Sequence, residues 1–106
     1  MTDRMNETRR THYCGVLTAK EEGQTVTVCG FAQKQRDLGN LIFIDLRDRT
    51  GMVQLAFNDR TDRAVFEKAG EVRSEFVLMA TGTVARRESV NTELATGEIE
   101  ILVTDL

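Results

Sequence analysis

One stretch of this sequence, residues 41–57, alternates between apolar and other side chains so regularly that it restricts the chain to a β-sheet fold. Its two alternating runs flank residues 48–51, whose Asp, Thr and Gly supply the chemistry of a tight turn. The pattern therefore predicts a β-hairpin. Because successive side chains of a strand point to opposite faces, one face of this hairpin is apolar throughout and is expected to face a core. That face consists of Ile42, Ile44, Leu46, Val53, Leu55 and Phe57.

Two further elements flank the hairpin. Two-residue alternation starting at Thr25 predicts a strand before it, and Gly30 inside that run predicts a bulge or a sharp bend. After the hairpin, apolar residues recur at helical spacing between positions 58 and 73. This spacing predicts one short helix, with Thr61 or Asp62 as its N-cap.

The last third of the chain predicts two more strands. The uncharged run 76–85 is typical of a buried strand, and alternation returns over residues 98–106 after a polar loop. The order is strand, strand, strand, helix, strand, strand, which matches the OB-fold, a five-stranded Greek-key barrel with its helix between strands 3 and 4. We expect residues 10–106 to form this domain and residues 1–9 to be a flexible lead-in.

Composition limits what the domain can do. The chain has 106 residues, 14 basic and 17 acidic, so its net charge is −3 and its length suits one core. Counterion release rewards an excess of Lys and Arg, so an anionic partner has to meet a local basic patch. No run approaches the roughly 18 apolar residues of a membrane span, and the N-terminus does not resemble a signal peptide. We therefore expect a cytoplasmic protein without membrane contact.

The sequence shows no catalytic or metal site. Cys14 and Cys29, with His12 as the one histidine, do not supply four metal ligands and are expected to be reduced, packed thiols. No phosphate-cradling loop, dinucleotide fingerprint or serine elbow occurs. Two acidic pairs, Asp45 with Asp48 and Glu98 with Glu100, resemble a catalytic pair only superficially. Neither has a partner base, so we expect a binding module without a cofactor of its own.

The second face of the hairpin carries the candidate binding residues. If the turn is centred between residues 49 and 50, Asp45 lies opposite Gln54, and Phe43 is a diagonal neighbour of Gln54. An exposed ring can stack on a nucleobase, and the adjacent amide offers a donor and an acceptor to the base edge. The alternative is an ordinary surface phenylalanine covered by the N-terminal segment or by a neighbouring domain.

Four basic residues lie where they can support such a site. Lys34 and Arg36 end the first strand, and Arg86 and Arg87 begin the long loop, so they are candidates for contacts with phosphates or base edges. Glu100 is a candidate acceptor for a base amino group. The alternative for each of them taken singly is a solvated surface charge.

Several segments together resemble a known family. They are RTHYCG (10–15), TVTVCGFAQKQRDLGNLIFIDLRDRTGMVQLAF (25–57), EFVLMATGTVARR (75–87) and ATGEIEI (95–101). From residue 10 onward the chain resembles the N-terminal anticodon-binding domain of bacterial aspartyl-tRNA synthetase, a class II aminoacyl-tRNA synthetase. The run from Arg36 to Gln54 carries the family-level specificity. The family often has three consecutive basic residues where this chain has Lys34, Gln35 and Arg36.

The resemblance implies that this domain binds the anticodon loop of aspartate tRNA. Phe43 matches the aromatic residue expected to stack on the central anticodon base, and Gln54 matches the amide expected to bond the edge of that uracil. Further anticodon contacts are implied for a set of residues whose individual bases are left open. They are Arg36, Arg86, Glu100 and, in the long loop, Ser89.

The resemblance also implies a parent enzyme, an aspartate-tRNA ligase. In that family a catalytic domain follows, binds ATP, Mg²⁺ and aspartate, and supplies most of a homodimer. None of it is present in these 106 residues, so we expect a domain cut from a longer chain. Two alternative functions stay open at this point: a general module that binds single-stranded nucleic acid, and a protein-interaction OB domain.

Overall fold

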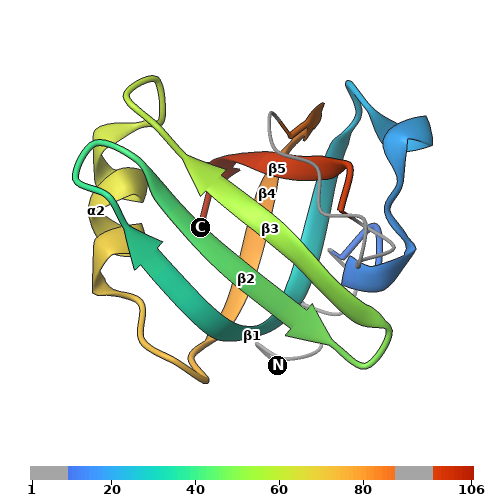
Figure 1. Cartoon of the computed structure of the whole chain (residues 1–106), viewed down its shortest axis with the longest axis horizontal. Helices are drawn as coiled ribbons and strands as arrows, with labels where there is room; N and C mark the ends of the chain where they lie inside the picture. Colours follow the sequence, from blue (N-terminus) through green and yellow to red (C-terminus); the bar gives the residue numbers. More distant parts are fainter. Residues whose placement is uncertain (1–9, 88–96) are drawn as a thin grey trace.

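Five strands close into a barrel in the order β1-β2-β3-β5-β4 (Figure 1). The structure is a computed structural model that describes residues 10–87 and 97–106, so the expected lead-in lies outside the described residues. The strands are β1 (Thr25–Asp37), β2 (Ile42–Asp48), β3 (Gly51–Phe57), β4 (Val77–Arg86) and β5 (Ile99–Asp105). The helix α2 (Arg63–Glu71) falls between β3 and β4. This is the predicted OB-fold architecture and element order.

The hairpin of β2 and β3 supplies much of the barrel core. Asp48 pairs with Gly51 across the two-residue turn, and this register places Asp45 opposite Gln54, as predicted. All six residues of the apolar face are at most 1% exposed. Ile99, Ile101 and Val103 of β5 close the core from the other side. The alternation in the sequence therefore predicted correctly which face points inward.

The strand β3 is buried on both faces. It pairs with β2 on one side and, in parallel, with β5 on the other. Gln54 and Ala56, which alternate with the core residues, are only 7% and 3% exposed. The outer face of β3 is therefore a covered surface, although its residues looked solvent-facing in the sequence.

The irregularity of β1 lies further along than predicted. Pairing with β4 runs in register through Gly30, and the register shift occurs in the pairing with β2, between Ala32 and Lys34. Gly30 has a different role: a Cβ at this position would collide with the backbone carbonyl of Arg47. The glycine therefore permits the close approach of two strands rather than forming the bulge.

The prediction of a fully buried fourth strand is also wrong in part. Val77, the first residue of β4, is 83% exposed and Phe76 just before it is 49% exposed, whereas Ala80 and Val84 face the core. One face of β4 packs inward and the other meets solvent. The solvated face of an antiparallel strand can carry uncharged residues. The sequence of β4 therefore did not show that its side chains alternate between the core and solvent.

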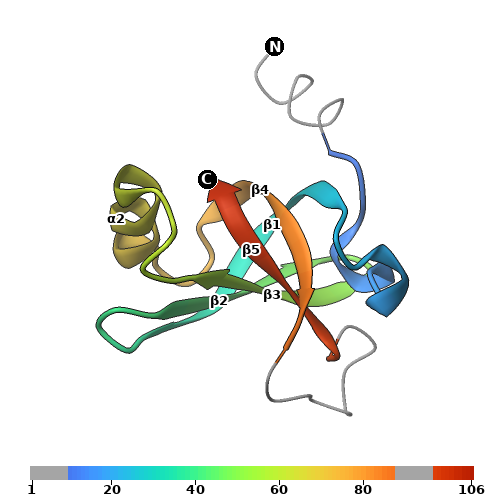
Figure 2. The ribbon, with the colours of Figure 1, turned by 90° about the horizontal axis from the view of Figure 1, so that it is seen from above.

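Helical segments lie at the two ends of the barrel. Asp62 is the N-cap of α2 and accepts a hydrogen bond from the amide of Ala64 at 3.1 Å. Thr61, the other predicted cap, instead accepts from the amide of Asn58. Two short 3₁₀ helices that the sequence did not reveal, η1 (Cys14–Val16) and η2 (Ala19–Glu21), lie at the end opposite α2 (Figures 1 and 2).

The Asp48 carboxylate ties η1 to the hairpin turn. One oxygen accepts from the Cys14 amide at 2.7 Å, and the other accepts from the Thr50 amide at 2.8 Å and its hydroxyl at 2.6 Å. Burial raises the pKa of this carboxyl, but hydrogen bonds from Thr50 and Cys14 stabilise its charged form more, so the pKa lies below its ordinary value. Gly51 completes the turn with a φ of +148°.

We expect Asp48→Asn to destabilise the fold at pH 7 by about 1–2 kcal/mol, because an amide nitrogen cannot accept from the Cys14 amide. The folded-state pKa of Asp48 is lowered, so its stabilisation is present above the unfolded-state pKa of about 4 and is lost as the pH falls through the folded-state value. Urea denaturation of wild type and variant at pH 7 and at pH 3 measures the difference in their free energies of unfolding at each pH. An equally large difference between wild type and variant at both pH values would contradict the assigned role of the charge.

We expect Ile44→Ala to lower the free energy of unfolding by about 2–5 kcal/mol, since Ile44 is fully buried in the barrel. The matched control is Phe43→Ala one residue away, which removes a half-buried side chain from the outer face and is expected to shift the melting temperature far less. Thermal denaturation of both variants measures their melting temperatures. A larger fall for Phe43→Ala than for Ile44→Ala would show that the strand faces are inverted.

Candidate nucleic-acid interface

A hollow of about 560 Å³ opens on the outer face of the barrel and draws residues from all five strands. We call it the Phe43 hollow. Its lining consists of Arg36, Leu41, Phe43, Gln54, Ala56, Asn58, Ala85, Arg86, Arg87, Glu100 and Leu102. Six of the eight residues predicted from the sequence meet here. Lys34 is exposed on β1 and is not part of the lining, and Ser89 lies outside the described residues.

Strand pairing explains why residues far apart in sequence meet in this hollow. Arg36 is the pairing partner of Phe43 between β1 and β2, and Gln54 is the partner of Glu100 between β3 and β5. Ala85, next to Arg86, pairs with Glu100 between β4 and β5. Strand pairing therefore brings candidate residues from all five strands to one hollow on the outer surface.

The amide of Gln54 links a cation to a carboxylate. Its Oε1 accepts from Nη2 of Arg36 at 2.9 Å, and its Nε2 donates to Oε1 of Glu100 at 2.9 Å. A buried amide requires such partners, because an unsatisfied polar group is costly in the interior. Sequence reasoning predicted Gln54 as an exposed reading group, but it is a buried amide whose two ends are already engaged.

The ring of Phe43 lies beneath the same arginine. The guanidinium carbon of Arg36 is 5.0 Å from the ring centroid, within the range of a cation–π contact. Phe43 is half-buried and lines the hollow while its neighbours Ile42 and Ile44 face the core. The ring is therefore available to a flat ligand once the flexible Arg36 side chain moves away.

Arg86, another lining residue of the Phe43 hollow, is held by two carboxylates. Its Nε lies 3.3 Å from Oε1 of Glu22, and its Nη1 lies 3.7 Å from Oε2 of Glu98. All three side chains are at least 48% exposed, so these ion pairs contribute little to stability. An anionic ligand can therefore compete for Arg86 at small cost.

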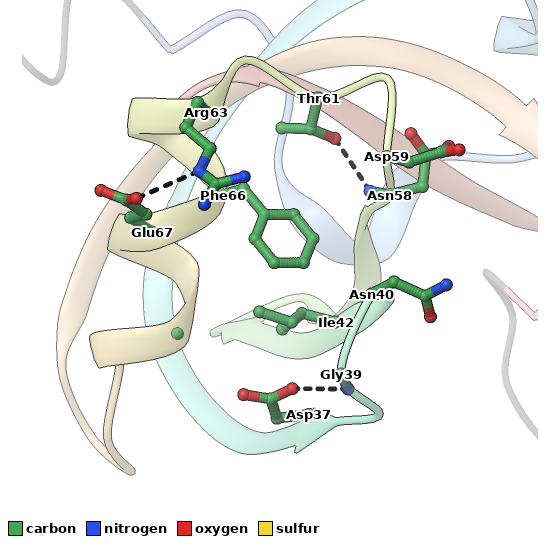
Figure 3. Close-up of a pocket in the computed structure, with 11 residues that line it drawn as sticks. Asp37, Gly39, Asn40, Ile42, Asn58, Asp59, Thr61, Arg63, Phe66 and Glu67 are labelled. Carbon is green, nitrogen blue, oxygen red and sulfur yellow. Dashed lines mark hydrogen bonds and ion pairs between the residues drawn. The ribbon is translucent and has the colours of Figure 1, made fainter.

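Charge distinguishes the Phe43 hollow from a second one beside α2. The Phe43 hollow carries three arginines against one glutamate, in a chain of net charge −3. The second hollow, of about 470 Å³, carries Asp37, Asp59 and Glu67 against Arg63, which is paired with Glu67 at 3.2 Å (Figure 3). Of these two hollows, the Phe43 hollow has the charge that suits a phosphate-bearing ligand.

Sequence reasoning missed some residues of the interface. Asn58, which belongs to both hollows, follows the hairpin with no periodic signal that marks it. Glu22 lies 64 residues from Arg86 in the chain. A contact over that separation depends on barrel closure, which no local sequence pattern reports.

Groups that could suggest catalysis have structural roles. Asp48 is engaged by the turn and η1, and it is not a partner of Asp45 in an acid–base pair. Burial raises the pKa of the Cys14 thiol, and the nearby Asp48 carboxylate raises it further, so the thiol stays protonated. Neither Cys14 nor Cys29 forms a disulfide; Cys14 is buried, as expected of a packed thiol, whereas Cys29 is only partly buried.

Over residues 10–87 and 97–106, no group of three or more His, Cys, Asp and Glu side chains is arranged to hold a metal ion. No helix in the same ranges is long and apolar enough to cross a membrane.

Comparison with known proteins gives a matching family and several relatives. Residues 26–106 match the family described as the OB-fold nucleic acid binding domain. The aspartate–tRNA ligase of Ruminiclostridium cellulolyticum is 51% identical across the whole of this chain, which covers 18% of that protein. The aspartate–tRNA(Asp/Asn) ligase of Bacillus thuringiensis is 53% identical over 90% of this chain and 16% of its own length. The chain thus spans less than a fifth of these curated relatives.

Solved structures share the barrel. The asparaginyl-tRNA synthetase of Pyrococcus horikoshii matches with a TM-score of 0.75 and 26% identity, over 89% of this chain and 21% of that one. An OBody bound to hen egg-white lysozyme matches with a TM-score of 0.80 and 25% identity, over 91% of this chain and 89% of that one. Both likenesses agree with the closed five-stranded barrel described above.

Proposed function

This chain belongs to the family of OB-fold nucleic-acid-binding domains and is homologous to part of the aspartate–tRNA ligases, and from that membership we propose that it binds the anticodon loop of aspartate tRNA. In the proposed complex the loop bases are splayed apart and read singly, which is the usual route to sequence-specific recognition of RNA. The domain serves a parent enzyme that attaches aspartate to this tRNA.

One observation supports the proposal above the others: a half-buried aromatic ring and a buried amide lie side by side in a cationic hollow. Phe43 supplies a surface on which the central base of the anticodon stacks. Gln54 supplies an amide that bonds the edge of the same base, a uracil. The net negative charge of the chain keeps non-specific binding weak, so recognition depends on this local site.

The remaining candidate residues surround this pair. Arg36, Arg86 and Glu100 supply further polar contacts to the anticodon, and Arg87 at the rim meets a phosphate. Lys34, exposed on β1, is the second proposed phosphate contact. Ser89, which lies outside the described residues, is also proposed to contact the anticodon.

Activation of aspartate is assigned to the rest of the parent enzyme, which we propose to be a cytoplasmic homodimer that uses ATP and Mg²⁺. The relatives are more than five times as long as the region they share with this chain, which leaves room for a catalytic part. No role in that chemistry is proposed for the residues of this domain.

Titration of the chain with an aspartate-tRNA anticodon stem-loop tests the proposal. We expect tighter binding than to a stem-loop whose central U is changed, because Gln54 can complement only one edge pattern at a time. Fluorescence anisotropy at fixed salt measures both affinities. Equal affinities and a steep salt dependence would favour a general single-strand-binding module instead.

We expect Phe43→Ala to cost about 1–3 kcal/mol of stem-loop binding through lost stacking, with the fold intact. Isothermal titration calorimetry measures the change. The control is Ile44→Ala, which should lower stability while the folded fraction still binds RNA. Unchanged RNA binding by Phe43→Ala, with loss of a protein complex, would favour the protein-interaction alternative.

A further inference from the structure

We infer that Glu100 is a positioning residue that fixes the direction of the Gln54 amide, and that this fixed direction makes the Phe43 hollow select uracil over cytosine. The inference rests on the proposed function and deepens it. It assigns Glu100 an effect through Gln54, where the resemblance implied only a direct contact with the anticodon.

The hydrogen bonds set which end of the amide points where. A carboxylate only accepts hydrogen bonds and a guanidinium only donates them. Glu100 therefore attracts the Nε2 end of Gln54, and Arg36 attracts the Oε1 end, each at 2.9 Å. A flipped amide would set its oxygen against the carboxylate and its nitrogen against the guanidinium. Both contacts would then be repulsive, so one orientation is strongly favoured.

The engaged amide still has one donor and one acceptor for a ligand. Nε2 carries a second hydrogen and Oε1 a second lone pair. Uracil complements this pair with its N3–H donor and an adjacent carbonyl acceptor. Cytosine presents the reverse order, an N3 acceptor beside an amino donor, so it would need the flipped amide. The direction of the amide therefore decides which pyrimidine is bound.

Glu100, rather than Arg36, holds that direction when a base is present. Arg36 lies over the ring of Phe43, 5.0 Å from its centroid, so a base that stacks on the ring must displace it. Glu100 belongs to β5 and is the strand-pairing partner of Gln54 on β3. Its carboxylate accepts directly from the amide at 2.9 Å, so the inference makes Glu100 the partner that persists in the complex.

The test compares the affinities of two anticodon stem-loops that differ only in a central U or C. We expect Glu100→Gln to lower the ratio of U-loop to C-loop affinity about tenfold, because a glutamine at position 100 accepts or donates and tolerates either amide direction. Glu100→Asp is a second variant that keeps the charge but withdraws the carboxylate by one methylene. It is expected to lower the ratio as well.

Three matched variants separate positioning from other roles. Phe43→Ala should weaken both loops by a similar factor and preserve the ratio, since stacking tolerates any base. Glu67→Gln removes one negative charge from the other hollow, so it should also preserve the ratio. In a Gln54→Ala background, Glu100→Gln should have no further effect on the ratio, because Glu100 acts through the amide.

The outcomes are distinct. A lowered ratio that disappears in the Gln54→Ala background supports the inference. An unchanged ratio in both Glu100 variants overturns it, and so does an effect that persists without Gln54, which would indicate direct contact with the base. A wild-type chain that binds both loops equally would overturn the proposed function itself, which is a separate result.

Discussion

The two-residue turn between β2 and β3 is the constraint on which the rest of the structure depends. It pairs Asp48 with Gly51 and so sets the register of the whole hairpin. A slip of one residue would move every apolar side chain of one strand from the core to the surface. The Asp48 carboxylate stabilises this turn and connects it to η1. The turn therefore determines which hairpin residues face the core and which lie on the outer face.

The outer face combines two requirements that usually conflict. A buried amide at Gln54 has to be satisfied, and a reading group has to keep hydrogen-bonding capacity for its ligand. The structure meets both, because Arg36 and Glu100 each engage one end of the amide and leave one donor and one acceptor over. The lining of the Phe43 hollow also carries three arginines and one glutamate, in a chain whose net charge is −3.

Much of the fold and most of the candidate site were predictable from the sequence, for local reasons. Alternation separated the buried Ile44 from the outer Phe43, and turn chemistry gave the register that places Phe43 near Gln54. The predictions that were wrong depended on neighbours. Gly30 meets a carbonyl from β2, and the start of β4 has an uncharged but exposed side, so neither environment is visible in its own segment.

The sequence by itself determined the number and order of the strands, the place of the α-helix between β3 and β4, the inward face of each hairpin strand and the residues capable of binding a base. These properties follow from periodicity, which acts over a few residues. Only the tertiary structure decided that Gln54 is buried and which way its amide points. Barrel closure places β5 beside β3 and brings Glu100 to Gln54 across 46 residues of chain, and that contact depends on strand pairing rather than on any local pattern.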